Sequence, residues 1–277
     1  MRTQRSKNLV SQLVLPVMSF LMLYPVFWWI GASLKKNSEM GSPSIWPEEP
    51  MWENFTKGWF ISADYNFTTF YANTLMMEFF NVLGGVVTSA LVAYGFARLN
   101  FKFRGFWFSI LLLTLMLPGQ VTIIPQYIFY NNLGLVNSYI PLILPHFLGG
   151  GAFFIFLLVQ FIRGIPRELD EAAKIDGASV YGIFLRIIFP LVKPALVTVA
   201  IFTFIWSWDD FFGQVLYLSS IEKYTVSLGL RMFVDQFEVQ WGQLLAMSLL
   251  SVLPSVIVFF LAQKHFVEGI ATTGIKG

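Results

Sequence analysis

Long uncharged stretches alternate with short charged ones along this 277-residue chain. A membrane helix needs about 20 mostly apolar residues, because the hydrocarbon core of a bilayer is about 30 Å thick. The stretches without Asp, Glu, Lys or Arg that reach or approach this scale are 8–34, 79–97, 105–162, 194–208 and 239–263. The third is long enough for two crossings, and turn-forming residues between 131 and 138 divide it. The pattern therefore predicts six membrane-spanning helices.

The chain is expected to form a single all-α membrane domain. Its expected spans are about 9–32, 72–97, 105–128, 139–162, 188–210 and 240–263. They leave a charged loop at 163–190 and a tail at 264–277. The first apolar run exceeds the roughly 7–15 residues of a signal peptide core, so it is interpreted as a membrane helix rather than a cleaved leader.

Composition supports a membrane protein. Hydrophobic residues make up 56% of the chain and charged residues 12%, whereas about 25% of the residues of a soluble domain are charged. Cysteine is absent, which excludes disulfides and thiolate metal sites. The sequence has no basic face interleaved with aromatic residues, so a nucleic-acid partner is not expected.

Loop charges predict the orientation in the membrane. Thirteen of the 18 basic residues fall on the side that carries the 163–190 loop, the N-terminus and the C-terminus. Cytoplasmic loops carry the excess of Lys and Arg, so both termini and this loop are expected in the cytoplasm.

Residues that carry enzyme chemistry are missing. The sequence has no phosphate-binding Gly-x4-Gly-Lys-Ser/Thr loop and no Gly-x-Ser-x-Gly elbow. His146 and His265 are far apart in sequence, and no acidic or histidine residues stand at metal-ligand spacing. The chain is therefore not expected to be an enzyme, nor to hold a metal or a cofactor of its own.

The charged loop is predicted to be a helix–turn–helix. Pro166 suits the first position of a helix. The acidic residues after it suit the N-terminal turn of that helix, where the helix dipole favours negative charge. Gly177 can adopt positive φ and end this helix, while Ser179 can cap a second one that runs to Phe189, before Pro190. The alternative is a solvated connector with no partner.

The loop also resembles a known motif. Glu171-Ala172-Ala173, then Gly177 after three residues, then Ile187-x-Phe189-Pro190 is similar to the loop of the membrane subunits of ATP-driven bacterial importers, which usually have Leu before that proline. Further matches occur at 93–99, 117–120, 134–135, 165–166, 208–211 and 269–277. They resemble the carbohydrate-uptake branch, in particular the maltose-type second permease subunit. The branch more often has Asn where Asp209 stands.

This resemblance implies a type I ABC importer permease in the inner membrane of a bacterium. It implies four further proteins: a different second permease subunit, two cytoplasmic ATPase subunits and an extracytoplasmic solute-binding protein. ATP and Mg would be bound by the ATPase subunits. The residues implied to contact an ATPase subunit are Glu171, Ala172, Ala173, Asp176, Gly177, Ile187 and Pro190 in the loop, with Gly269, Gly274, Lys276 and Gly277 in the tail.

The transported solute is expected to be a sugar, most simply an oligosaccharide. Aromatic rings and carboxylates suited to a sugar stand together in Trp206, Trp208, Asp209 and Asp210, where the fifth span ends. Anchoring at the membrane interface is the alternative role for these residues. A secondary transporter, a permease for a solute such as a glycerol phosphate, and a scaffold that transports nothing are the alternative functions.

Overall fold

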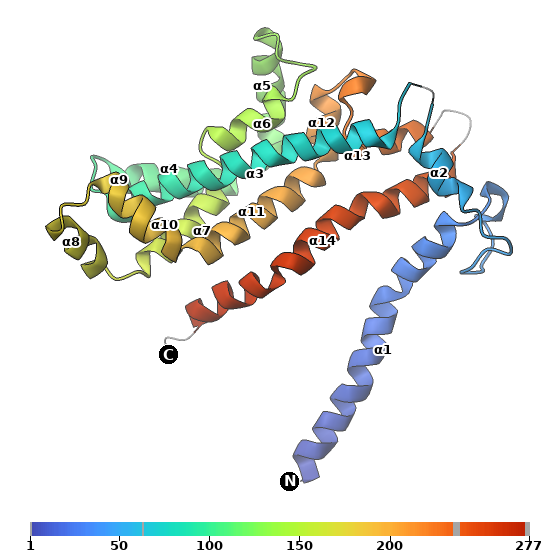
Figure 1. The fold of residues 1–277 in the computed structure, drawn as a ribbon, viewed down its shortest axis with the longest axis horizontal. Coiled ribbons are helices and arrows are strands. Elements are labelled where there is room, and N and C mark those ends of the chain that lie inside the picture. Colours follow the sequence, from blue (N-terminus) through green and yellow to red (C-terminus); the bar gives the residue numbers. More distant parts are fainter. Residues whose placement is uncertain (1, 63, 235–238, 275–277) are drawn as a thin grey trace. The chain divides into compact units, whose positions relative to one another are not determined.

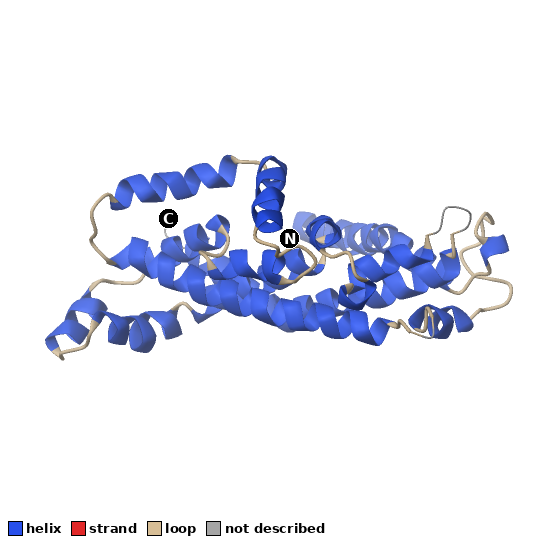
Figure 2. Ribbon diagram, turned by 90° about the horizontal axis from the view of Figure 1, so that it is seen from above, coloured by secondary structure: helices blue, strands red, loops and turns tan. Residues whose placement is uncertain are grey.

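The computed structural model describes residues 2–62, 64–234 and 239–274 and is almost entirely helical (Figure 1 and Figure 2). Within these residues β pairing is limited to one isolated bridge between Val234 and Val239. The longer helices are α1 (Arg2–Ser33), α3 (Phe67–Arg98), α4 (Arg104–Met116), α5 (Gly119–Asn132), α7 (Ala152–Arg163), α11 (Lys193–Trp208) and α14 (Trp241–Gly274). The shorter helical segments are η1 (Asn37–Glu39), α2 (Glu53–Trp59), α6 (Ile140–Phe147), α8 (Glu168–Ile175), α9 (Val180–Ile183), η2 (Phe184–Ile188), α10 (Phe189–Leu191), α12 (Phe211–Tyr217), η3 (Ile221–Lys223), α13 (Val226–Gly229) and η4 (Leu230–Phe233).

Four helical stretches are long and apolar enough to cross a membrane: Val14–Ser33, Phe67–Arg98, Ile140–Arg163 and Trp241–Gln263. Two bent pairs raise the number to six if each pair is one span. The all-α class with up to six spans agrees with the sequence prediction.

The bent pairs overlap the spans expected at 105–128 and 188–210. Helices α4 and α5 turn by 102° at Leu117-Pro118, where the residue before proline is extended (φ −80°, ψ 122°). Proline lacks an N–H and disfavours helical backbone at the preceding residue, so the helix breaks there. The second pair bends by 77° at Val192, which separates α10 from α11.

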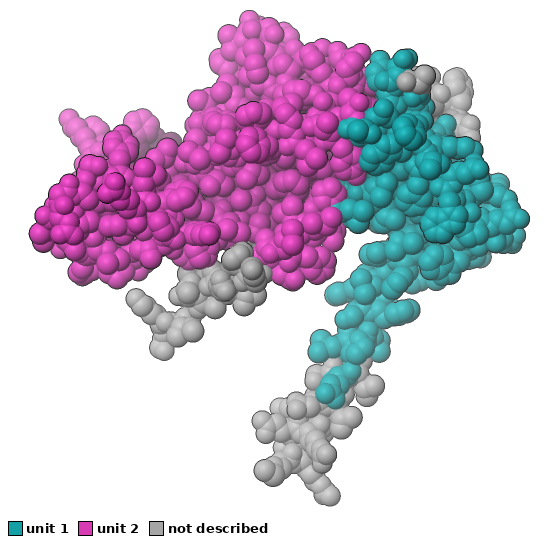
Figure 3. Space-filling model, viewed as in Figure 1, with its two compact units in different colours: residues 1–68, 229–253 teal, residues 69–228, 254–277 magenta. Residues whose placement is uncertain are grey.

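The chain forms two compact units, residues 1–68 with 229–253 and residues 69–228 with 254–277 (Figure 3). In the first unit the segment after α1 is tied down by side chains. Lys35 is 1% exposed and its Nζ donates to the Ser44 carbonyl at 2.5 Å, while Asn54 Nδ2 donates to the Ser33 carbonyl at 2.9 Å. Buried lysine and asparagine groups need such partners, and here they hold the loop in one conformation.

The second unit contains the main apolar core, built from α3, α7, η2 and α11. Small residues on one face of α3 (Ala90, Ala93 and Ala97) are 3% exposed or less, and they let neighbouring helices approach closely. Leu158 of α7 and Val199 of α11 are fully buried in the same cluster. The same cluster includes Ala173, Ile183 and Phe184 of the charged loop, so the loop packs against the bundle.

Candidate functional site

The first helix of the charged loop, α8, begins with acidic residues. Its N-cap is Arg167, whose carbonyl accepts hydrogen bonds from the N–H groups of Asp170 and Glu171 at 2.9 and 3.1 Å. Glu168, Asp170 and Glu171 lie in the first turn, where the helix dipole favours negative charge. Pro166 precedes the N-cap rather than occupying the first helical position that we predicted.

Gly177 ends α8 in the left-handed conformation, with φ +79°. The N–H of Ala178 donates to the Ala173 carbonyl at 2.9 Å, and the N–H of Gly177 donates to the Lys174 carbonyl at 3.0 Å. With Asp176 as C-cap, these bonds form a complete Schellman motif. The predicted role of Gly177 as a helix stop is confirmed.

Ser179 caps the second helix, as its position predicted. Its Oγ accepts a hydrogen bond from the Gly182 N–H at 3.1 Å, and α9 follows. The chain then passes through one π-helical segment, η2, in which the Phe189 N–H bonds to the Phe184 carbonyl. Helical structure continues through Pro190 to the end of α10, so the second helix does not end before the proline. Wider π-type turns are common at functional positions of helices.

An ion pair anchors α8 to the end of α3. Arg98 Nε lies 3.2 Å from Asp170 Oδ2, and the two side chains are only 3% and 12% exposed. Arg98 also donates to the Ile165 carbonyl at 2.7 Å. Sequence reasoning missed this pair, because it counted Arg98 as a topology charge and Asp170 as a helix-dipole acid. The signal that could have found it was helical spacing, since Asp170 shares a face of α8 with Ala173, which packs in the core.

The second helix is anchored next to the same end of α3. Tyr94 donates its hydroxyl to the Val180 carbonyl at 3.1 Å, and its ring lies 5.0 Å from that of Phe184. Ile188 is fully buried, and Ile187 is half-buried against the core cluster. Both helices of the loop are therefore attached to the bundle.

The opposite face of the loop is exposed and partly apolar. Ile175 is 87% exposed and Tyr181 75%, and Leu185 is 60% exposed. Glu171, Ala172, Asp176, Gly177 and Pro190 are exposed as well, whereas Ala173 is buried. The loop brings most of the predicted ATPase-contact residues onto one connected segment. Apolar side chains grouped on a charged, exposed segment are typical of a protein-docking surface.

The four residues expected near the solute do not form one cluster. Trp206 is 52% exposed and stacks on Phe154 at 5.2 Å, whereas Trp208 is 2% exposed. Asp209 is the C-cap of α11, and Asp210 is the N-cap of α12, where its Oδ1 accepts from the Gly213 N–H at 2.9 Å. Of these four, only Asp210 lines a cavity that the structure describes.

That cavity lies among α5, α6 and α12 and holds about 610 Å³; we call it the α5–α12 cavity. Its polar lining residues are Gln120, Thr122, Gln126, His146, Asp210 and Tyr217. Sequence reasoning missed all of these except Asp210, because their convergence depends on the turn at Pro118 and on the break between α6 and α7. The volume falls within the range of small-molecule sites, about 300–1,000 Å³.

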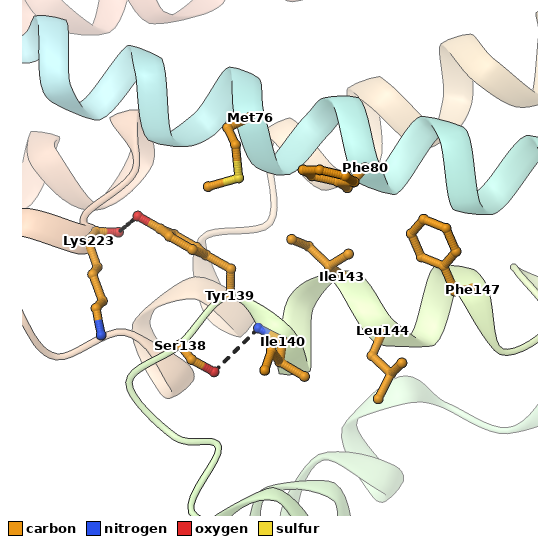
Figure 4. Close-up of a pocket in the computed structure, with 9 residues that line it drawn as sticks. All are labelled: Met76, Phe80, Ser138, Tyr139, Ile140, Ile143, Leu144, Phe147 and Lys223. Atoms are coloured by element: carbon orange, nitrogen blue, oxygen red, sulfur yellow. Dashed lines mark hydrogen bonds between the residues drawn. The ribbon is translucent and has the colours of Figure 1, made fainter.

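A second cavity, of about 450 Å³, is apolar (Figure 4). Met76 and Phe80 of α3 face Ile143 and Phe147 of α6 across it. At one end the Tyr139 hydroxyl donates to the Lys223 carbonyl at 3.1 Å, which leaves few polar groups for a solute. This cavity is therefore a poor site for a polyhydroxylated molecule.

The tail residues are only partly described. Gly269 and Gly274 belong to the backbone of α14, which ends at Gly274, while Lys276 and Gly277 lie outside the described residues. Among the described residues, no group of three His, Cys, Asp or Glu side chains is placed to hold a metal ion.

These features define a class: an integral membrane protein with an exposed helix–turn–helix loop fixed to its bundle. Comparison with known proteins identifies the family. The family described as "binding-protein-dependent transport system inner membrane component" matches residues 85–271. The chain belongs to this family, which is one of transport components.

Individual relatives match nearly the whole chain. It is 34% identical to the probable ABC transporter permease protein YurM of Bacillus subtilis, over 99% of this chain and 91% of the relative. It is 31% identical to the arabinooligosaccharides transport system permease protein AraQ of the same organism, over 94% and 93%. A solved bacterial ABC transporter that imports the acidic polysaccharide alginate superposes with a TM-score of 0.82 at 23% identity, covering 96% of this chain and 98% of that one. The fold is thus the type I ABC importer permease fold.

Proposed function

We propose that this chain is one membrane subunit of an ATP-driven importer of sugars, most simply oligosaccharides. The observation that carries the proposal is the exposed helix–turn–helix, fixed to the bundle by Arg98–Asp170 and by Tyr94. A segment that is rigidly attached on one face and partly apolar on the other can transmit movement from a partner to the membrane helices. The names of relatives such as AraQ support a sugar as the transported solute.

The proposed partner of the loop is a cytoplasmic ATPase subunit, in which ATP and Mg are bound. The Glu171 side chain is exposed and makes no ion pair or hydrogen bond with the described residues, so it is free to meet a basic group of the partner. Gly177 provides the tight turn that presents α8 and α9 side by side. An interfacial ion pair of this kind fixes register more than it adds affinity.

The remaining parts of the proposed complex are those typical of such importers. A second, different permease subunit would complete the pathway, and two ATPase subunits and an extracytoplasmic solute-binding protein would complete the importer. The excess of basic residues favours a cytoplasmic position for both termini and the loop in a bacterium. The tail, including Gly269, Gly274, Lys276 and Gly277, is proposed to reach the ATPase subunits.

The test removes the docking chemistry without touching the spans. In the complete complex, Glu171→Ala and Gly177→Leu should abolish sugar uptake while the chain still inserts in the membrane. Glu168→Ala is the matched control for the first change, because Glu168 is an exposed acid in the same turn of α8. Gly105→Leu is the control for the second, since no atom lies within 4 Å of a Cβ placed there.

The measurement is uptake of labelled oligosaccharide into proteoliposomes, with ATP hydrolysis followed in the same samples. Loss of uptake with continued ATP hydrolysis would be uncoupling. Uptake that survives both Glu171→Ala and Gly177→Leu would contradict the coupling role. Uptake driven by an ion gradient without ATP would instead favour a secondary transporter. A preference for glycerol phosphate would show that the solute is not a sugar.

A further inference from the structure

The α5–α12 cavity carries polar groups that the chain itself does not use. The side chains of Gln120, Gln126 and His146 line it, and none has a hydrogen-bond partner among the described residues. Thr122 differs, because its Oγ1 already donates to the Gly119 carbonyl at 2.8 Å. Two amides and an imidazole facing one cavity can both donate and accept hydrogen bonds. Such a set matches hydroxyl groups, which also do both.

Asp210 presents one carboxylate oxygen to the cavity. Its Oδ1 is occupied by the Gly213 N–H at 2.9 Å, which fixes the orientation of the side chain. Its Oδ2 has no partner among the described residues. An ionised carboxylate can accept hydrogen bonds but cannot donate them. The free oxygen therefore fits a hydroxyl donor and not another anion. Phe212, which is 58% exposed, adds an apolar ring to the lining, on which the C–H face of a sugar can pack.

The local charge is negative. No Lys or Arg lines the cavity within the described part of the chain. Asp210 is the acidic side chain among the lining residues. Like charges brought together in a partly desolvated site repel strongly, so an anionic solute is disfavoured here.

We propose that the α5–α12 cavity is a solute site on this chain that selects uncharged, polyhydroxylated molecules and rejects anions. This rests on the proposed import function and narrows it, because it separates neutral oligosaccharides from acidic ones such as oligouronates and from phosphorylated solutes. Gln120, Gln126 and the free oxygen of Asp210 bind the hydroxyl groups.

The absence of cysteine gives a direct test of the local charge. Gln126→Cys in the complete transporter places the only thiol of this chain in the cavity. Its rates of modification by cationic and anionic methanethiosulfonates are measured by mass spectrometry of this chain and normalised to a neutral reagent. Asn132→Cys is the matched control, because this exposed position at the end of the same helix does not line the cavity and has no charged neighbour in the sequence.

The expected cation-to-anion rate ratio at position 126 is at least about tenfold above the ratio at position 132. Asp210→Asn in the same background should lower it severalfold, and asparagine keeps the N-cap bond to Gly213. A neutral arabinose trisaccharide should protect the thiol at 126 from modification, whereas a uronate trisaccharide of equal length should not.

Three outcomes overturn the inference. Faster reaction with the anionic reagent contradicts the charge argument. Better protection by the uronate trisaccharide reverses the assigned substrate class. No protection by either trisaccharide, with ATP-driven sugar uptake intact, removes the cavity from the pathway and leaves the proposed import function standing. Absence of ATP-driven uptake in the wild-type complex, by contrast, is the failure of the proposed function itself.

A cavity-filling variant tests the same site without a thiol. No atom lies within 4 Å of a Cβ placed on Gly119, which lines the cavity. Gly119→Phe should therefore occupy the space and reduce uptake of the neutral trisaccharide at least about fivefold, while Gly105→Phe leaves uptake unchanged. Unchanged uptake in Gly119→Phe, with equal amounts of chain in the membrane, would also overturn the inference.

Discussion

The Arg98–Asp170 pair makes a sharp prediction about the docking loop. Asp170→Ala leaves the guanidinium of Arg98, whose side chain is 3% exposed, without its carboxylate. Arg98 keeps its hydrogen bond to the Ile165 carbonyl, which is 2.7 Å long. Because a buried charge without a counter-charge is costly, we expect α8 to leave the end of α3 in this variant.

The size of the effect follows from the geometry. Unit charges 3.2 Å apart attract by about 5 kcal/mol at an effective dielectric constant of about 20. Desolvation offsets much of this, and removing one partner of a buried pair costs about 3–5 kcal/mol. Asp170 Oδ1 and Arg98 Nε lack a hydrogen bond among the described residues, which favours the lower end. About 3 kcal/mol corresponds to roughly a hundredfold shift towards undocked α8.

Hydrogen exchange of the α8 backbone amides in the complete complex measures this shift. Asp170→Ala should accelerate exchange by up to about a hundredfold, and sugar uptake should fall with it. Glu168→Ala is the matched control, since it removes an exposed carboxylate from the same turn. The double change Arg98→Leu with Asp170→Leu should accelerate α8 exchange less than Asp170→Ala alone, because it leaves no unpaired charge.

Two results would refute the reasoning. Exchange in Asp170→Ala equal to that in Glu168→Ala would show that the pair does not hold α8. A double variant whose cost equals the sum of the two single changes would show that Arg98 and Asp170 act independently.

Three further predictions concern local structure. Gly31→Ala places a Cβ 2.0 Å from the Ile45 carbonyl oxygen and should lower the melting temperature, whereas Gly41→Ala, with nothing within 4 Å, should not. Ser179→Ala should cost about 1 kcal/mol of helix stability and speed amide exchange in α9. The hydrogen bond from Lys36 lowers the pKa of Glu49 below its ordinary value, so their pair is present at neutral pH and is lost as the pH falls through the lowered value. Both side chains are exposed, so Lys36→Met should leave the melting temperature at pH 7 unchanged.

Local chemistry explains what the sequence could predict about the loop. Positive φ at Gly177 and the cap at Ser179 depend on residues within a few positions of each other, so their signals lie in the sequence itself. Exclusion of charge from lipid similarly predicts where apolar helices lie. The fold class and the turn in the loop can therefore be predicted from the amino-acid sequence.

Long-range geometry explains the rest. Pro118 predicts a kink, but the angle of 102° depends on what α4 and α5 pack against, and proline alone does not determine it. Gln126 and Asp210, which are far apart in the sequence, line the same α5–α12 cavity. The Arg98–Asp170 contact also joins distant parts of the chain. Each residue can be explained locally, Arg98 as a loop charge and Asp170 as an acid at a helix start, so the sequence does not indicate that they pair.

The two sites differ in how they must be built, and the structure reflects this. A docking loop has to move as one body with the membrane helices, and here a Schellman turn, an ion pair and a tyrosine hydrogen bond fix its helices to α3. A solute site in a transporter needs hydrogen-bonding groups that the chain itself does not already use. Gln120, Gln126 and His146 meet that condition. Paired side chains at the base of the loop and unpaired ones in the cavity are therefore what coupling and transport respectively require.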